Sequence, residues 1–319
     1  MLAKDIIQRV REIQVRTGRQ VADVLAGEYI SVFKGRGVEF DEVRPYVAGD
    51  DIRTIDWKVT ARMGEPFVKR YVEERQLTLM LMADVSPSQN FGSIARSKRE
   101  AAAELCALLA FSATRNDDKV GLTLFHGGIE QYIPARKGQK HALRVVREVL
   151  AHGPDSPESV PAPRRRWVPR LSPRRRVRRA EDSTDIAAAM EFLLSVTPRK
   201  TICFVVSDFF DEGYEKALRA ANRKHDVIAV LISDPREMEI PGVGLLALRD
   251  AESGQTRLFD TDSAEFRNEV RRSAGERLRE LERSFGRSGI DFIHVDTSES
   301  VVEPLIRFFR MREGRNRRR

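Results

Sequence analysis

Two short apolar runs in this chain each end at an aspartate. The first covers residues 77–83 and is followed by Asp84, and the second covers residues 201–207 and is followed by Asp208. Near-continuous apolar runs of this length are typical of parallel strands that are covered on both faces. Because the carboxyl ends of parallel strands meet at one edge of a sheet, we expect both carboxylates at the edge where open α/β sheets bind ligands.

Strand and helix patterns alternate from residue 76 to residue 319. Strands are predicted at 77–84, 119–127, 129–136, 201–208, 226–234 and 291–297, with helices between most of them and a closing helix at 301–313. The strand at 129–136 is expected at a sheet edge. This alternation predicts an α/β fold, a Rossmann-like and mostly parallel sheet with helices on both faces.

The regions outside this alternation have other compositions. Residues 1–27 have apolar residues at helical spacing, and residues 27–75 mix short extended pieces, glycine turns and opposite charges. We therefore expect residues 1–75 to form a small helix plus strand and loop segment ahead of a domain at 76–319. Within that domain, residues 153–183 are rich in arginine and proline and predict an extended surface insert.

Five oxygen-bearing side chains are candidate ligands of one metal ion: Asp84, Ser86, Ser88, Thr184 and Asp208. Carboxylate and hydroxyl oxygens suit hard cations, so Mg²⁺ is expected, with Mn²⁺ or Ca²⁺ as alternatives. The three loops contain no histidine or cysteine, which argues against zinc. The alternative is that the serines and Thr184 cap helices and that Asp208 lies in an ordinary turn.

The order of these residues, D-x-S-x-S, then threonine, then aspartate, resembles the metal-ion-dependent adhesion site of von Willebrand factor A domains. The glycine often found before the threonine is absent, and Ser207 replaces a common threonine. Upstream, G-D-D-I-R-x-I-D-W at residues 49–57 resembles the signature of domain of unknown function family 58. The resemblance implies an A-type domain in a bacterial adaptor or chaperone-like factor that works with a MoxR-type AAA+ ATPase.

The signature also contains charged residues around one aromatic side chain: Asp50, Asp51, Arg53, Asp56 and Trp57. Such a cluster usually braces a loop through salt bridges, and contact with a partner protein is the alternative interpretation.

The basic character of the chain is local. Nine arginines lie between Arg164 and Arg179, whereas the net charge of the whole chain is only +8. The stretch that contains Arg164, Arg165, Arg166 and Trp167 is expected to meet an acidic partner protein. Tethering to nucleic acid or to an anionic membrane surface stays open as an alternative, and the nucleic-acid form has less support because no known nucleic-acid-binding motif is present.

Composition favours a cytoplasmic protein. No apolar run approaches the roughly 20 residues that a bilayer-spanning helix needs, and the two cysteines suggest reduced, buried thiols. No GxxxxGK[ST] phosphate loop is present, so a partner would have to hydrolyse any ATP. The expected function is a non-enzymatic, metal-dependent protein-interaction module that acts on client proteins. A metal-dependent hydrolase is the rival, with Asp185, Asp211 and the insert arginines as its candidate groups.

Overall fold

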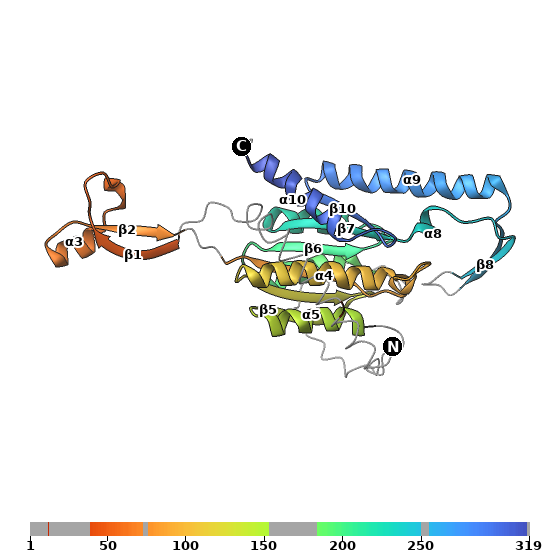
Figure 1. Ribbon diagram of the computed structural model, residues 1–319, viewed down its shortest axis with the longest axis horizontal. Helices are drawn as coiled ribbons and strands as arrows, with labels where there is room; N and C mark the ends of the chain where they lie inside the picture. The colour runs from red at the N-terminus through yellow and green to blue at the C-terminus, as the bar shows by residue number, and fades with distance from the viewer. Residues whose placement is uncertain (1–11, 13–38, 73–75, 153–183, 250–254, 318–319) are drawn as a thin grey trace, which may run out of the picture.

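A six-stranded sheet forms the centre of the α/β region (Figure 1). The structure is a computed structural model that describes residue 12 and residues 39–72, 76–152, 184–249 and 255–317. The sheet has the order β10-β7-β6-β3-β4-β5. Its strands are β3 (Thr78–Asp84), β4 (Lys119–Phe125), β5 (Ile129–Arg136), β6 (Ile202–Ser207), β7 (Asp226–Ser233) and β10 (Asp291–Asp296).

The pairing of these strands confirms the predicted fold class. All neighbouring strands are parallel except β4 and β5, which run antiparallel and put β5 at one edge of the sheet. Numbered along the chain within this sheet, the strands have the 3-2-1-4-5-6 order of doubly wound folds. The domain is therefore a Rossmann-like α/β domain with a mostly parallel sheet.

Helices cover both faces of the sheet. One face carries α4 (Lys98–Arg115), α5 (Gln139–Ala151) and α10 (Val302–Arg317), and the other carries α6 (Ile186–Val196), α7 (Glu215–Lys224) and α9 (Ala264–Arg287). Within β3, Leu79 and Leu81 pack in the first core and Met80 and Met82 in the second. Successive side chains of a strand point to opposite faces. Both sets are buried, which explains why the run is apolar throughout.

A hairpin and a short helix between β7 and α9 are not predicted by the sequence patterns. The helix is α8 (Pro235–Met238), and the hairpin pairs β8 (Leu245–Arg249) with β9 (Thr256–Asp260). Phe259 of the hairpin stacks on Phe266 of α9, with ring centroids 5.2 Å apart. Five-residue strands with an exposed face leave only a weak periodic pattern, because few of their side chains are buried.

The signature segment forms a separate two-stranded sheet. Strands β1 (Glu39–Pro45) and β2 (Phe67–Val72) pair antiparallel, and between them lie a 3-10 helix, η2 (Ile52–Thr54), and α3 (Trp57–Met63). The strand and loop content agrees with the expectation for this segment, and the seven-residue α3 is additional.

The aspartates of the signature brace this segment. Asp51 accepts the N–H of Arg53, and Asp56 accepts N–H groups of the first turn of α3, so both carboxylates cap helices. Asp50 pairs with Arg44 of β1 at 2.6 Å. Trp57 is 70% exposed, so it is not packed as a bracing aromatic would be. Contact of Trp57 with a partner stays a prediction.

Several expectations concern residues outside the described part of the chain. They are most of the helix at 1–27 and the insert at 153–183, including Arg164, Arg165, Arg166 and Trp167. The predicted domain boundary near residue 75 also falls there and stays a prediction. Among the described residues, no helix is long and apolar enough to cross a membrane. Cys106 and Cys203 are buried free thiols, as expected.

Candidate cation-binding site

The carboxyl ends of β3 and β6 place Asp84 and Asp208 side by side. The two strands are parallel neighbours, with Ala83 in register with Val206, so the residues that follow emerge at the same edge of the sheet. Both aspartates are buried. The juxtaposition expected from the two apolar runs is therefore present.

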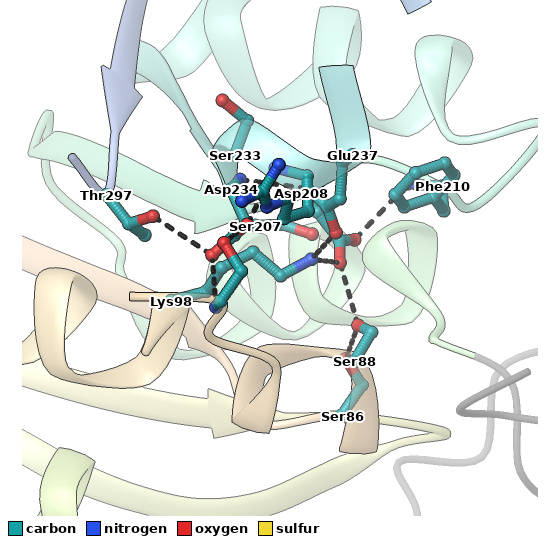
Figure 2. A network of polar contacts seen from close by, with 12 residues as sticks. Ser86, Ser88, Lys98, Ser207, Asp208, Phe210, Ser233, Asp234, Glu237 and Thr297 are labelled. Carbon is teal, nitrogen blue, oxygen red and sulfur yellow. Dashed lines mark hydrogen bonds and ion pairs between the residues drawn. The ribbon is translucent and has the colours of Figure 1, made fainter. Parts of the chain in front are cut away.

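Hydrogen bonds connect four of the five candidate ligands. Asp84 Oδ1 accepts the N–H of Ser86 at 2.9 Å, and the Ser86 and Ser88 hydroxyl oxygens lie 2.9 Å apart. Ser88 Oγ donates to Asp208 Oδ2 at 2.7 Å, as Figure 2 shows. Hydrogen bonds, the first of them from a backbone N–H, thus join the D-x-S-x-S loop after β3 to the aspartate after β6.

Thr184 lies in the loop that leads into α6 at the same edge. The N–H of Asp185 donates to the carbonyl of His126 after β4, and the N–H of Ile186 donates to the carboxylate of Asp211 after β6. The Thr184 side chain is 4% exposed, and its hydroxyl has no hydrogen-bond partner among the described residues. No hydrogen bond joins this hydroxyl to the other four candidates in that part of the chain.

The helix-capping alternative does not account for these side chains. Helix α4 begins with a capping box formed by Ser97 and Glu100, and Ser86 precedes a 3-10 helix, η3 (Pro87–Asn90), without a side-chain cap. Helix α6 is capped by Asp185, whose carboxylate accepts the N–H of Ala188, and not by Thr184. The serine and threonine hydroxyls are therefore free of a capping role.

Ser207 holds the second oxygen of Asp84. Its hydroxyl donates to Asp84 Oδ2 at 2.6 Å and accepts the N–H of Phe209 at 3.1 Å. The sequence interpretation noted Ser207 only as a departure from the family pattern. A hydroxyl at the last position of an otherwise apolar buried strand is the signal that identifies it.

Lys98, from the first turn of α4, reaches into the same cluster. Its side chain is fully buried, and Nζ lies 2.9 Å from Asp208 Oδ2 and 2.5 Å from Glu237 Oε1 of α8 (Figure 2). Burial alone would lower the pKa of Lys98, but Asp208 and Glu237 outweigh it and raise this pKa above the ordinary 10.5. The sequence interpretation did not identify Lys98. The sequence feature that could have identified Lys98 is a lysine at a helix N-terminus, where a positive charge is unfavourable unless carboxylates bind it.

Arg277 of α9 closes one side of the site. Its guanidinium donates to the backbone carbonyl of Asp208 and stacks over the ring of Phe210, 3.6 Å from the ring centroid. Phe210 is 53% exposed. Beside it lies an open pocket of about 340 Å³ between α8 and α9. Its walls are Phe210, Leu231, Ser233, Glu237, Met238, Glu269, Val270, Ser273, Ala274, Arg277 and Leu278.

The electrostatics of the site favour uptake of a cation or a proton. Burial, followed by the charge of Asp208, raises the pKa of Asp84 to about 7, although Ser207 and Ser86 lower it in part through hydrogen bonds. Ionising a buried carboxylate with such a pKa costs free energy near neutral pH. A cation beside Asp84 would remove that cost.

The family model described as "Protein of unknown function DUF58" matches residues 42–280, which include part of β1, all of β2 and most of the α/β domain. This chain belongs to the DUF58 family. The uncharacterized proteins Rv1480 of Mycobacterium tuberculosis and Mb1516 of Mycobacterium bovis are each 29% identical to this DUF58 protein over 300 residues. That alignment covers 94% of this chain and 87% of theirs.

Two solved structures resemble this DUF58 protein, with low sequence identities and low TM-scores. The conserved hypothetical protein BatB from Bacteroides thetaiotaomicron is 18% identical, covers 75% of this chain and 99% of its own, and has a TM-score of 0.43. The SpRpn10 VWA domain is 10% identical, covers 73% of this chain and 94% of its own, and has a TM-score of 0.36.

The donor set of this DUF58 protein fits a hard cation with few charged ligands. It consists of oxygen atoms only, and the buried, unpartnered Thr184 hydroxyl is a donor that the described protein groups leave unused. No group of three or more His, Cys, Asp or Glu side chains suited to a metal occurs among the described residues. The described residues therefore do not fit a zinc centre built from three or more such ligands. Two carboxylates with hydroxyls and water are suitable for Mg²⁺.

Proposed function

We propose that this DUF58 protein is a protein-interaction module in which a divalent cation, Mg²⁺ first and Mn²⁺ or Ca²⁺ as substitutes, binds a carboxylate of a partner protein. The ligands in this proposal are the five candidates Asp84, Ser86, Ser88, Thr184 and Asp208. The single observation that carries it is the Thr184 hydroxyl, which is buried without a partner among the described residues, at the edge where hydrogen bonds link the other four residues.

The charge balance of the site favours an anionic ligand. Of the five side chains only Asp84 and Asp208 carry charge, and Asp208 already forms an ion pair with Lys98. A divalent ion held by this set keeps positive charge and open coordination positions. A carboxylate is the hard oxygen ligand that a partner protein can add.

The surroundings favour a protein as the carrier of that carboxylate. Phe91 and Ile94, which lie shortly after the serine loop, and Phe210, which lies after Asp208, are large apolar side chains that are each at least 44% exposed. Exposed apolar and aromatic residues beside a charged centre are typical of protein-binding surfaces. A small diffusible anion would not need them.

A MoxR-type AAA+ ATPase is the proposed partner, in a cytoplasmic complex that acts on client proteins. The resemblance in the signature at residues 49–57 supports this choice, together with the absence of a phosphate loop from the sequence. Trp57, exposed at the start of α3, is the residue that we propose for contact with the ATPase. The acidic partner at the cation site is then either the ATPase or its client.

The hydrolase alternative has less support from the site. Its candidate carboxylates already have structural roles, because Asp185 caps α6 and Asp211 accepts the N–H of Ile186. Lys98 is buried between two carboxylates and is not presented to solvent. Neither named carboxylate is thus left unengaged as a general base, which favours the interaction module over the hydrolase.

Co-purification tests the proposed function. The full chain is incubated with the MoxR-type ATPase of the same genome, in Mg²⁺ or in excess EDTA. We expect capture in Mg²⁺ only, and loss of capture with Asp84→Asn. The matched control is Asp118→Asn, which changes a buried aspartate that accepts the N–H of Leu77 at the opposite edge of the sheet and should leave capture intact. Equal capture in EDTA would overturn the cation-dependent function.

A further inference from the structure

Lys98 Nζ and Ser88 Oγ contact the same carboxylate oxygen, Asp208 Oδ2, at 2.9 Å and 2.7 Å (Figure 2). The ammonium group is therefore bound directly to an atom of the candidate cation site. The Lys98 side chain is fully buried, and Nζ also lies 5.8 Å from the centre of the Phe210 ring. A permanent positive charge already occupies one side of the site.

We propose that Lys98 is a built-in counter-cation that competes with the divalent ion for Asp208 and so sets the affinity of the site for that ion. This inference rests on the proposed function. It assigns to Lys98 and Glu237 a role in ion affinity that the five-residue ligand set does not include.

Glu237 makes such competition workable. A buried ammonium that loses its only carboxylate is left uncompensated, which is strongly unfavourable. Lys98 has a second carboxylate, because Glu237 Oε1 lies 2.5 Å from Nζ. The other oxygen, Glu237 Oε2, accepts the N–H of Asp234 and so fixes the side chain on α8. Lys98 can therefore release Asp208 to a divalent ion and remain paired with Glu237.

A purely structural salt bridge is the competing explanation. Lys98 joins α4 to the loop after β6 and to α8, and a connection of this kind stabilises the edge of the sheet. If Lys98 only held the ligands in place, its removal would weaken ion binding. If it competes with the ion, its removal strengthens binding, because a like charge close to the ion is gone. The two explanations predict effects of opposite sign.

The test is a titration of the full chain with Mn²⁺, in which binding is measured by calorimetry and by the spin-resonance signal of free Mn²⁺. We expect Lys98→Met to tighten Mn²⁺ binding by on the order of tenfold or more. We expect Glu237→Gln to weaken binding, because the ammonium then depends on Asp208 alone, while the amide oxygen of glutamine can still accept the N–H of Asp234. Lys119→Met, which removes the same charge from the exposed start of β4, is the control and should leave the affinity unchanged.

Circular dichroism identifies variants that fail to fold. If Lys98→Met leaves Glu237 unpaired and does not fold, the double variant Lys98→Met/Glu237→Gln removes both charges and should still bind Mn²⁺ more tightly than the wild type. Opposite shifts for Lys98→Met and Glu237→Gln support the proposal.

The results that overturn the proposal also show whether the proposed function stands. Unchanged or weaker binding by a folded Lys98 variant, while the wild type still binds Mn²⁺, overturns the role of Lys98 and leaves the proposed function intact. If neither the wild type nor any folded variant takes up Mn²⁺, the role of Lys98 and the proposed function are both overturned.

Discussion

Ser207 Oγ donates a 2.6 Å hydrogen bond to Asp84 Oδ2. This bond joins the carboxyl end of β6 to the carboxyl end of β3. Ser207→Ala removes this donor from a buried carboxylate, and it also removes the acceptor for the N–H of Phe209. We expect a loss of about 1–3 kcal/mol in the free energy of unfolding, larger at pH 8.5 than at pH 5, because only the ionised carboxylate needs the donor.

Urea denaturation at the two pH values measures this loss. The control is Ser112→Ala in α4, which changes another buried serine, one whose hydroxyl has no partner among the described residues. That variant should be neutral at both pH values. An equal effect of the two substitutions would contradict the role given to Ser207.

Asp84→Asn should stabilise the cation-free protein. Burial, followed by the charge of Asp208, raises the pKa of Asp84 from 3.8 to about 7 in the folded state. Between these values the folded protein holds a proton that the unfolded chain has released, so the free energy of unfolding falls as the pH rises through this window. In chelator we expect the variant to be more stable than the wild type by about 2 kcal/mol or more at pH 8, and equally stable near pH 4.

Thermal melts with and without Mg²⁺ complete this prediction. The ion should stabilise the wild type, because it binds only the folded state, and should have no effect on Asp84→Asn. A variant that is less stable than the wild type at pH 8 in chelator would show that the ionised Asp84 carboxylate does not destabilise the cation-free protein.

Phe210→Ala should separate partner binding from ion binding. The ring is 53% exposed and stacks on Arg277, and the described interactions of its side chain do not include a ligand of the proposed ion. We expect unchanged Mg²⁺ uptake and a loss of about 1–2 kcal/mol in the free energy of partner binding. Met311→Ala, at an exposed position on α10, is the control and should change neither. Equal partner affinity after Phe210→Ala would exclude this aromatic from the interface.

Gly121→Ala tests the packing of β4 against its neighbours. A Cβ at this position would lie 2.5 Å from Met80 Sδ and 3.0–3.1 Å from backbone atoms of β5. Methionine can move, but the backbone of a paired strand cannot, so we expect a loss of about 1–3 kcal/mol in the free energy of unfolding. Gly128→Ala, where a Cβ meets nothing within 4 Å, should be neutral by the same urea measurement. A neutral Gly121→Ala would mean that β5 is not held against β4.

Most of the α/β fold could be predicted from sequence because buried parallel strands are apolar on both faces. The runs that became β3 and β6 have this property, and their ends place Asp84 and Asp208 together. The β8–β9 hairpin could not be predicted in the same way. Its strands have five residues each, and exposed Leu245 and Leu258 hide the usual alternation.

The candidate site was predictable to the extent that its residues follow strand ends. Lys98 escaped prediction because it lies ten residues after Ser88, in the first turn of a helix, and its two carboxylate partners come from the loop after β6 and from α8, much later in the chain. The capping residue of α6 was equally hidden, since Thr184 and Asp185 are both good caps and only the backbone geometry decides for Asp185.

The central claim is most directly tested by calorimetric titration of Mg²⁺ into the full chain and into two matched variants. Thr184→Val and Thr123→Val each remove a buried hydroxyl that has no partner among the described residues, the first at the site and the second inside β4. We expect one ion per wild-type chain, unchanged affinity for Thr123→Val, and affinity reduced by about tenfold or more for Thr184→Val. No uptake by the wild type at millimolar Mg²⁺, or equal affinity of both variants, would contradict the account.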